Sequence, residues 1–240
     1  YALADAFTVC DGYHCSMLGP TDPNRYYMWT GWDGNDGKNG GPGIANDGIG
    51  YNWQTYPERL QAAAISWKIY QDEGAGLDAA HFWGWGSDPY IGNYGDNSLL
   101  YFRNYQNAAP GSPLAQNART GTNVSKGGGF FDILAADVKN GQLPSVSWIV
   151  APEAYSEHAN WPANFGAWYT SQILDALTAN PEIWSKTVFF LNYDENDGFF
   201  DHVVPPTPPA SRAQGLSTVD TTNEIFASNA YYSSYVPGPI

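Results

Sequence analysis

The chain has 240 residues, which is enough for one sizeable domain with a buried core, and it carries a formal net charge of −14 at pH 7. This acidic balance argues against nucleic acid or an anionic membrane surface as the main partner, because both are negatively charged. Aromatic residues form 16% of the chain, with 10 Trp and 17 Tyr, a composition suited to pockets for sugars or quaternary ammonium groups.

The cysteine pattern bears on the compartment of the protein. Cys10 and Cys15 are the two cysteines, and their spacing fits neither a CxxC redox motif nor a zinc knuckle. They can pair in an exported protein or remain two buried thiols. Few Lys and many Asn, Gly, Trp and Tyr favour a secreted or periplasmic location. Within these 240 residues we expect neither a signal peptide nor a transmembrane segment, because no apolar run is long enough.

The N-terminal part predicts a strand followed by a turn and a helix. The apolar segment Ala6–Cys10 is expected to be a strand that enters the sheet. In the segment 15–25 (CSMLGPTDPNR), a Gly-Pro turn precedes Thr21, which is expected to cap a helix with Asp22 and Pro23 in its first turn. A hydroxyl at a helix N-terminus suits a phosphate ligand. On the local pattern alone, a plain N-cap is the favoured interpretation.

The next stretch, Trp32–Gly50, is a Gly/Asn/Asp-rich loop without apolar periodicity. Its side chains Asp33, Asn35 and Asp36 could hold a calcium ion, but loops of this composition are usually solvated turns. Both interpretations stay open at this point.

A helix and a strand are predicted after this loop. Thr55 opens a short helix to Ala64 with Pro57 in its first turn, and Ile65–Tyr70 reads as a strand. The later loop that contains Trp83 and Trp85 either lines a pocket or packs against the core.

Three helices and a second strand are expected in the middle of the chain. They are helices over Asn97–Asn107, Phe130–Lys139 and Phe165–Asn180 and a buried strand over Ser145–Val150. The second helix is closed by an Asn-Gly C-cap, and Pro181 stops the third.

The chain is expected to be organised around the stretch 187–202 (TVFFLNYDENDGFFDH). Its apolar run Val188–Leu191 predicts a strand buried on both faces. Asp194 and Glu195 follow at its end, where they offer oxygen ligands for a divalent cation, with His202 near enough to act on the same substrate. The alternative is an ordinary Asp/Asn/Gly turn, and the spacing excludes an EF-hand.

The order strand, polar loop, helix, strand, polar loop predicts a βαβ unit. Both polar loops then fall on the carboxyl edge of one sheet, where ligands bind in open α/β folds. The side chains expected to meet there are Glu157, His158, Asp194, Glu195 and His202. After Val204 the chain continues as a Pro-rich linker, and we assign 1–204 to an α/β core and 205–240 to a surface excursion of the same domain.

Three blocks carry a family resemblance. GPTDPNR (19–25), PEAYSEHANWPAN (152–164) and YDENDGFFDHV (193–203) resemble the bacterial phosphocholine-preferring phospholipases C. These belong to the phosphoesterase family, which also holds certain acid phosphatases and the plant non-specific phospholipases C. The resemblance covers essentially the whole chain, including 55–71 and 217–225, and implies an alkaline-phosphatase-like α/β/α sandwich.

The resemblance also implies roles for individual residues. Thr21 matches the family nucleophile, His158 the active-site histidine, and Asp194 with Glu195 the acidic pair that binds a divalent metal of unknown identity or orients phosphate. His202 matches the Asp-His-Val ending of the third block. Expected contacts of the phospholipid substrate and its phosphocholine headgroup are Asn24, Glu157, Trp83, Trp85 and Trp161.

Where plant members carry a histidine, this chain has Asn196, which favours a bacterial-type enzyme. Two family segments are missing: a first strand with a Glu-Asn pair before Tyr1, and a strand with an Asp-His segment after Ile240. We therefore expect a core truncated at both ends, with little or no activity by itself. Phosphatidylcholine hydrolysis by these 240 residues, abolished by Thr21→Ala, would contradict this expectation.

The expected reaction is attack of the Thr21 hydroxyl on the phosphodiester, release of diacylglycerol, and release of phosphocholine from Thr21 by water. His158 either protonates the leaving oxygen or stabilises charge on the equatorial phosphoryl oxygens. The alternatives are an acid phosphatase of the same family, a non-catalytic carbohydrate-binding module, and a glycosidase that uses Glu157 and Glu195.

Overall fold

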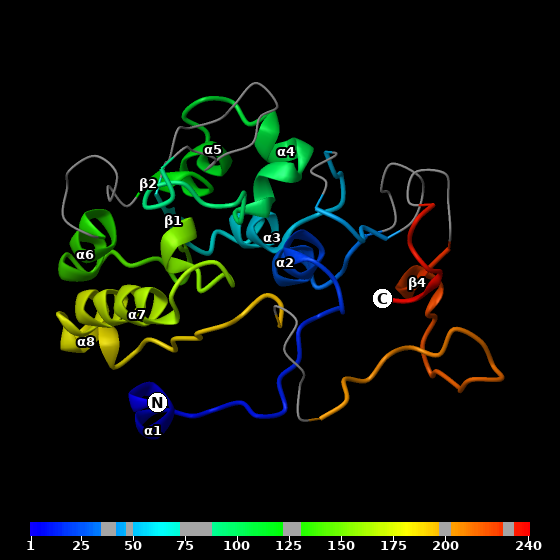
Figure 1. Cartoon of the computed structure of the whole chain (residues 1–240). Coiled ribbons are helices and arrows are strands. Elements are labelled where there is room, and N and C mark those ends of the chain that lie inside the picture. The colour runs from blue at the N-terminus through cyan, green and yellow to red at the C-terminus, as the bar shows by residue number, and fades with distance from the viewer. Residues whose placement is uncertain (35–41, 47–49, 73–87, 122–130, 197–202, 228–232) are drawn as a thin grey trace.

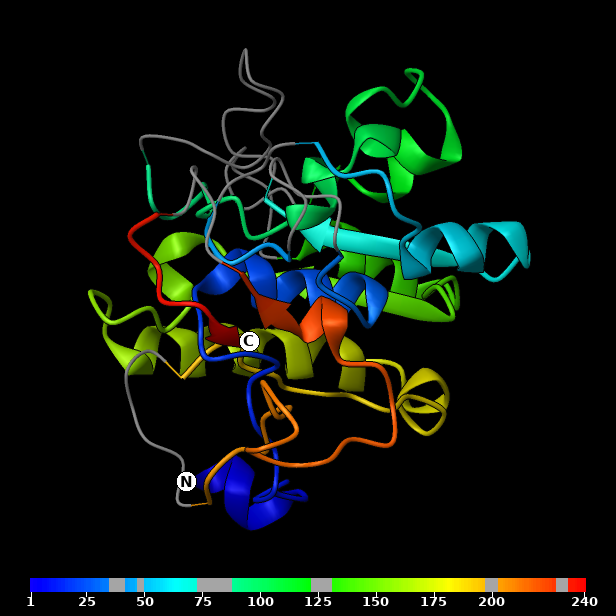
Figure 2. The ribbon, with the colours of Figure 1, turned by 90° about the vertical axis from the view of Figure 1, so that its right-hand side faces the viewer.

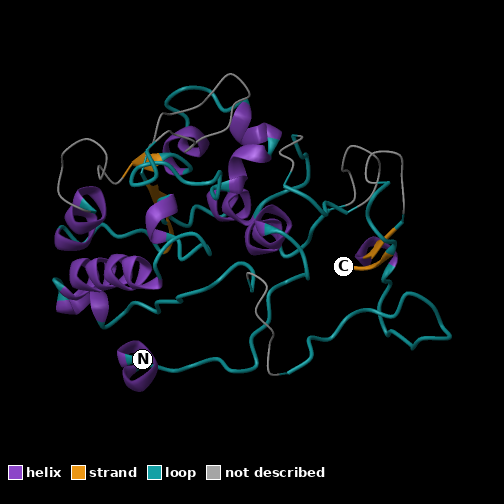
Figure 3. Cartoon of the chain, in the orientation of Figure 1, coloured by secondary structure: helices purple, strands orange, loops and turns teal. Residues whose placement is uncertain are grey.

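The structure is a computed structural model of the chain (Figure 1). It describes residues 1–34, 42–46, 50–72, 88–121, 131–196, 203–227 and 233–240. The described residues form a mixed fold of helices around a small sheet (Figure 3). Within them, no helix is both long and apolar enough to cross a membrane.

A three-stranded parallel sheet lies at the centre of the fold. Its middle strand β1 (Trp67–Gln71) pairs with β2 (Thr120–Gly121) on one side and with β3 (Val146–Val150) on the other. The β1–β3 register runs from Trp67 opposite Val146 to Gln71 opposite Val150. The predicted strands at 65–70 and 145–150 are therefore confirmed, although β3 is fully buried only at Val150.

Aromatic side chains fill one face of this sheet. Tyr26 and Trp29 of α2 (Thr21–Thr30) are completely buried there, and the Tyr26 ring meets the Tyr51 ring edge-on at 4.8 Å. The Trp29 indole N–H donates to Ser98 Oγ at 2.9 Å, which satisfies its polar atom inside the core. The other elements of this layer are α3 (Tyr56–Ala62), η1 (Ser98–Tyr101), α4 (Arg103–Gln106) and α5 (Pro113–Asn117).

The opposite face of the sheet is covered by α6 (Asp132–Lys139), α7 (Ala163–Thr178) and α8 (Pro181–Trp184). Tyr70 of β1 is buried in this layer, and its hydroxyl donates to Asp137 Oδ2 of α6 at 2.5 Å. The same carboxylate pairs with Lys68 Nζ at 2.6 Å. Helices thus cover both faces of the sheet.

Local signals placed most helices correctly. The helix predicted from Thr55 is α3, which begins with a capping box in which the Thr55 side chain accepts from the Glu58 N–H and Glu58 binds back to the Thr55 N–H. The helix predicted over 97–107 is divided at Phe102 into η1 and α4. Pro181, which was expected to stop α7, is also the first residue of α8, whose N-cap is Asn180. The short helices α5 and α8 were not predicted.

The prediction of a strand over Val188–Leu191 is wrong for the described chain. The run is extended but pairs with no strand in the part of the chain that the structure describes, and Val188 and Phe190 are 76% and 80% exposed. Of the four residues in this run, Phe189 is the one that packs against the core cluster to which α7 contributes. An apolar β-rich run becomes a buried strand only where a neighbouring strand supplies hydrogen bonds, and the local pattern could not show whether one does.

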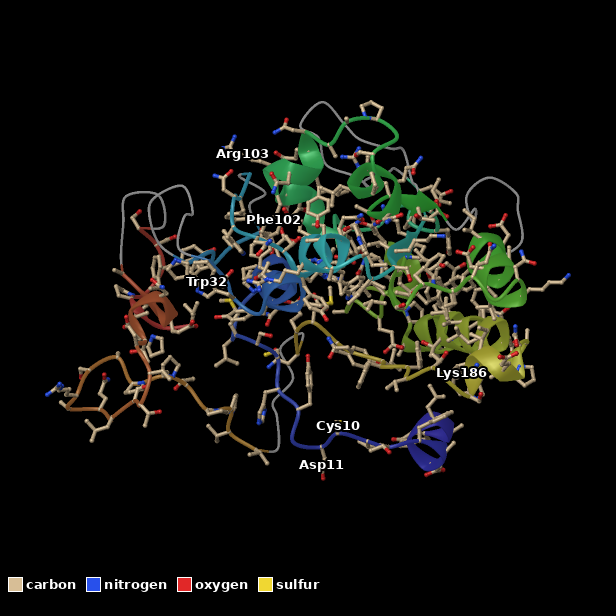
Figure 4. All side chains as sticks on the ribbon, turned by 180° about the vertical axis from the view of Figure 1, so that it is seen from behind. Cys10, Asp11, Trp32, Phe102, Arg103 and Lys186 are labelled. Atoms are coloured by element: carbon tan, nitrogen blue, oxygen red, sulfur yellow. The ribbon has the colours of Figure 1, made fainter. Side chains whose placement is uncertain are left out.

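The strand predicted over Ala6–Cys10 is also wrong. The described chain starts with α1 (Ala2–Ala6) and continues as an exposed segment over residues 7–13, after which Met17 is buried. Figure 4 shows Cys10 and Asp11 on this segment, away from the side chains that gather around Phe102. The two cysteines form no disulfide: Cys10 is exposed, and Cys15 Sγ donates to Met17 O at 3.1 Å.

The C-terminal part returns to α2. η3 (Thr222–Glu224) leads into β4 (Ile225–Phe226), which pairs antiparallel with β5 (Gly238–Pro239) beside α2 (Figure 2). Phe226 packs against Met17 and Ile44, and the Tyr27 hydroxyl donates to Glu224 Oε2 at 2.7 Å.

Candidate active site

Thr21 is the first residue of α2, and the structure differs here from the sequence prediction. The N-cap is Pro20, in the extended region, so the Thr21 side chain does not cap the helix. The Thr21 hydroxyl instead donates to Glu195 Oε1 at 3.2 Å. The dipole at the start of a helix favours a negative group at this point, although the Asp22 N–H already donates to Asn46 Oδ1 at 3.0 Å. A hydroxyl, a carboxylate and a helix N-terminus therefore meet in one place.

The turn before α2 is held by Asn24. The amide oxygen of this buried side chain accepts from Met17 N at 2.9 Å, and its nitrogen lies 3.1–3.2 Å from the carbonyl oxygens of Met17, Gly19 and Pro20. These contacts fix the backbone that carries Thr21. The predicted contact of Asn24 with substrate stays a prediction, and both atoms of its amide group already bond the backbone of this turn.

Arg25 ties three segments together. Its Nε donates to Asp194 Oδ2 at 3.2 Å, Nη1 donates to Asp96 O at 3.1 Å, and Nη2 lies 3.4 Å from Asp96 Oδ2. Burial alone would lower the pKa of Arg25, but the carboxylates of Asp96, Asp194 and Asp22 raise it overall. Arg25 was not among the predicted site residues, although its spacing of four from Thr21 places both on one helix face.

Asp96 is a buried acid of this group, with its side chain 5% exposed. The Asn93 side chain fixes its loop by accepting from Gly95 N and Asp96 N. Burial raises the pKa of Asp96; Arg25 opposes the rise, Asp194 adds to it, and His158 opposes it. No sequence pattern pointed to Asp96.

The two polar loops do converge. The Tyr193 hydroxyl donates to Glu157 Oε2 at 2.9 Å, and the Tyr13 hydroxyl donates to Tyr193 O at the same distance. Glu157 has a left-handed backbone with φ 63°, and a Cβ added at Gly166 of α7 would collide with its side chain. The two loops therefore touch at Glu157 and Tyr193, without the second strand that was expected to bring them together. That His158, Asp194, Glu195 and His202 share one site stays a prediction.

Tyr193→Phe should make the protein less sensitive to alkali. Burial, and then the hydrogen bond to Glu157, raise the pKa of Tyr193 to about 12 from its ordinary value of 10.0. Stability from this group is complete below pH 10 and is lost as the pH rises through 12, because the unfolded chain releases the proton first. The urea midpoint of the variant should fall less between pH 10 and pH 12.

The matched control is Tyr1→Phe, a change at a fully exposed side chain. An equal fall of the midpoint in both variants would contradict the role given to the Tyr193–Glu157 bond.

His158 lies on an exposed part of the loop that follows β3 and the short helix η2 (Glu153–Tyr155). Its Nδ1 is 2.5 Å from Asn160 Oδ1, and its ring lies 4.9 Å from the Tyr94 ring. Trp161, a predicted substrate contact, is partly buried and donates from its indole N–H to the Tyr94 hydroxyl at 2.9 Å. Asn160 and Tyr94 were not predicted.

Several predicted residues lie outside the described part of the chain. They are the substrate contacts Trp83 and Trp85, the catalytic candidate His202, and the calcium candidates Asn35 and Asp36.

The predicted metal ligands are Asp194 and Glu195. Glu195 brings a carboxylate next to the Thr21 hydroxyl and Asp194 brings one next to Arg25, and oxygen donors of this kind suit a hard divalent cation. One oxygen of each carboxylate is engaged, with Arg25 or with Thr21. Among the described residues, no group of three or more His, Cys, Asp or Glu side chains is arranged to hold a metal ion. The pair thus fits a part of a metal site.

Comparison with known proteins gives consistent matches. The chain is 67% identical over 239 residues to a protein named non-hemolytic phospholipase C from Burkholderia pseudomallei, covering 100% of this chain and 34% of that protein. It is 45% identical over 244 residues to the hemolytic phospholipase C of Pseudomonas aeruginosa (95% and 32%). It is 39% identical over 246 residues to phospholipase C B of Mycobacterium tuberculosis (100% and 42%). The chain thus spans less than half the length of these relatives.

The family assignment rests on the full chain. The profile of the Phosphoesterase family matches residues 1–238, which include all three blocks on which the sequence resemblance was based. The resemblance stated from the sequence is confirmed. The chain belongs to the phosphoesterase family.

Proposed function

We propose that the complete polypeptide that carries this chain is a phospholipase C, which hydrolyses the phosphodiester of phosphatidylcholine to diacylglycerol and phosphocholine. The observation that carries the proposal is the Thr21 hydroxyl, 3.2 Å from Glu195 at the start of α2, in a chain whose relatives are named phospholipase C. The proposed fold is an alkaline-phosphatase-like α/β/α sandwich, supported by helices on both faces of a parallel sheet.

In the first half of the proposed reaction, Thr21 Oγ attacks the phosphorus. The proton of the hydroxyl passes to Glu195 Oε1, its hydrogen-bond partner. The bond from phosphorus to the diacylglycerol oxygen breaks, and His158 gives that oxygen a proton. The positive end of the α2 dipole, at which Thr21 lies, stabilises the charge that develops on the phosphoryl oxygens.

In the second half, water attacks the phosphorus of the phosphocholine ester of Thr21. The new bond joins the water oxygen to phosphorus, and the bond from phosphorus to Thr21 Oγ breaks. A proton of the water restores His158, and the proton on Glu195 returns to Thr21. Asp194 and Glu195 are the residues that would hold a divalent cation, which when bound lowers the cost of forming the threonine alkoxide.

The choline group is proposed to bind among aromatic rings beside His158. The Tyr90 ring lies 5.9 Å from Tyr155 and 6.1 Å from Trp161, and the Trp161 indole is bonded to Tyr94. Aromatic faces attract a quaternary ammonium, and the nearby acid Glu153 adds negative charge. Trp83, Trp85 and Glu157 remain proposed substrate contacts, and His202 a proposed catalytic residue.

We also propose that residues 205–240 belong to the same domain as 1–204, because Phe226 packs against Met17 and Ile44. A secreted or periplasmic location is proposed from the composition.

The function is tested by comparing two substrates on the complete natural polypeptide. Phosphocholine release from phosphatidylcholine vesicles should exceed p-nitrophenol release from p-nitrophenyl phosphate in kcat/KM by at least about tenfold, because the aromatic cluster stabilises only the choline substrate. Chelation of divalent metal should abolish both activities. A preference for the phosphomonoester would show an acid phosphatase instead, and binding of sugars without either activity would show a carbohydrate-binding module.

A further inference from the structure

A chain of hydrogen bonds ends on His158. The Trp161 indole nitrogen lies 2.9 Å from the Tyr94 hydroxyl, the Tyr94 hydroxyl lies 3.2 Å from Asn160 Oδ1, and Asn160 Oδ1 lies 2.5 Å from His158 Nδ1. The Tyr94 ring also contacts the His158 ring, with centroids 4.9 Å apart. The surroundings of the histidine are thus determined by Asn160 and Trp161, which follow it closely in sequence, and by Tyr94 from a distant loop.

The direction of these bonds follows from the chemistry of their atoms. An indole N–H can only donate, so the Tyr94 oxygen accepts from Trp161 and its own hydrogen is directed to Asn160 Oδ1. An amide oxygen can only accept, so the hydrogen between Asn160 and His158 belongs to Nδ1 of the imidazole. In the neutral ring, Nε2 then carries the lone pair and is the nitrogen left for proton exchange.

We propose that Asn160 is a positioning residue that selects the Nδ1–H tautomer and the ring orientation of His158, and that Tyr94 and Trp161 hold the Asn160 amide for this task. The proposal rests on the proposed function, in which His158 protonates the leaving oxygen. The proton given up by the imidazolium is the one on Nε2, and the ring that remains keeps its hydrogen on Nδ1, bonded to Asn160. The backbone is held as well, since the His158 N–H donates to Ser156 Oγ at 3.3 Å.

The first test reads the tautomer directly and does not depend on activity. Nitrogen NMR of the complete natural polypeptide labelled at histidine should show His158 with a protonated Nδ1 at pH 8, with the signal assigned by its loss in His158→Gln. In Asn160→Ala the two tautomers should become mixed. Asn160→Asp should keep the Nδ1–H form, because a carboxylate also accepts from Nδ1.

The second test is kinetic. Asn160→Ala should lower kcat on phosphatidylcholine roughly 10- to 100-fold, the usual effect of removing a partner that orients a functional histidine, with KM changed by less than about twofold. Asn160→Asp should restore most of kcat, and Tyr94→Phe should lower kcat by a smaller factor. The matched control is Asn164→Ala, an exposed asparagine of the same sequence block, which should leave kcat unchanged.

The NMR and kinetic measurements test the role of Asn160 separately from the proposed phospholipase activity. An Nε2–H tautomer in the unmodified protein, or an Asn160→Ala variant with the tautomer and kcat both unchanged, would overturn the role of Asn160. Absence of phospholipase activity in the unmodified protein would overturn the proposed function, while the NMR result would still decide whether Asn160 selects the tautomer.

Discussion

Thr21→Ala is expected to lower phosphatidylcholine hydrolysis by the complete natural polypeptide about 10⁴-fold or more, as removal of the nucleophile does in other hydrolases with covalent intermediates. The fold should tolerate the change, because the hydroxyl does not cap α2 and its hydrogen bond goes to Glu195. Thr21→Ser keeps a hydroxyl at the same place and should retain measurable activity.

The matched control is Thr178→Ala. That hydroxyl donates to Leu174 O at 2.7 Å within its own helix, so its loss removes a threonine hydroxyl far from the site. A second measurement is covalent labelling: brief reaction with substrate should trap phosphocholine esterified to Thr21 in the unmodified protein and none in Thr21→Ala. An active Thr21→Ala variant would show that the nucleophile is another residue.

The second large effect is expected on stability. Arg25→Met should lower the free energy of unfolding by about 3–5 kcal/mol, the usual cost of removing one partner of a buried ion pair. Asp96 would keep a charge in a site where its side chain is 5% exposed, whereas Asp194, with a side chain 24% exposed, can be solvated. The measurement is urea unfolding, and Arg59→Met on the exposed surface of α3 is the control.

The pH dependence of this cost has a definite sign. Burial raises the pKa of Asp96, and Arg25 is the main opposing influence, so the Arg25→Met variant should raise that pKa further. A group whose pKa is raised in the folded state stabilises the fold at low pH and loses that contribution as the pH rises through its folded-state pKa. The deficit of Arg25→Met should therefore be smaller at about pH 4 than at pH 8.

A double variant isolates the pair. Asp96→Asn removes the charge but keeps the shape, so adding it to Arg25→Met should recover a large part of the lost stability. If the double variant is less stable than Arg25→Met by the full cost of Asp96→Asn alone, the two side chains are independent and the account of this ion pair is wrong.

The sequence by itself determined the features that depend on near neighbours. The β-rich runs of β1 and β3, the capping box at Thr55 and the helix that starts at Thr21 follow from residues a few positions apart, because propensities and caps act over that range. The family resemblance named Thr21, His158, Asp194 and Glu195. It did not name the residues that hold them.

The tertiary structure alone decided those partners and the state of the apolar run at 188–191. Arg25 bonds residues 71 and 169 positions away, and Tyr94 contacts a loop 66 positions away, so no local spacing reveals either contact. The run at 188–191 has the composition of a buried strand, and that composition does not change when the run is exposed. Whether such a run is buried, and which charges share a site, depends on the surfaces that pack against them, and these come from distant parts of the chain.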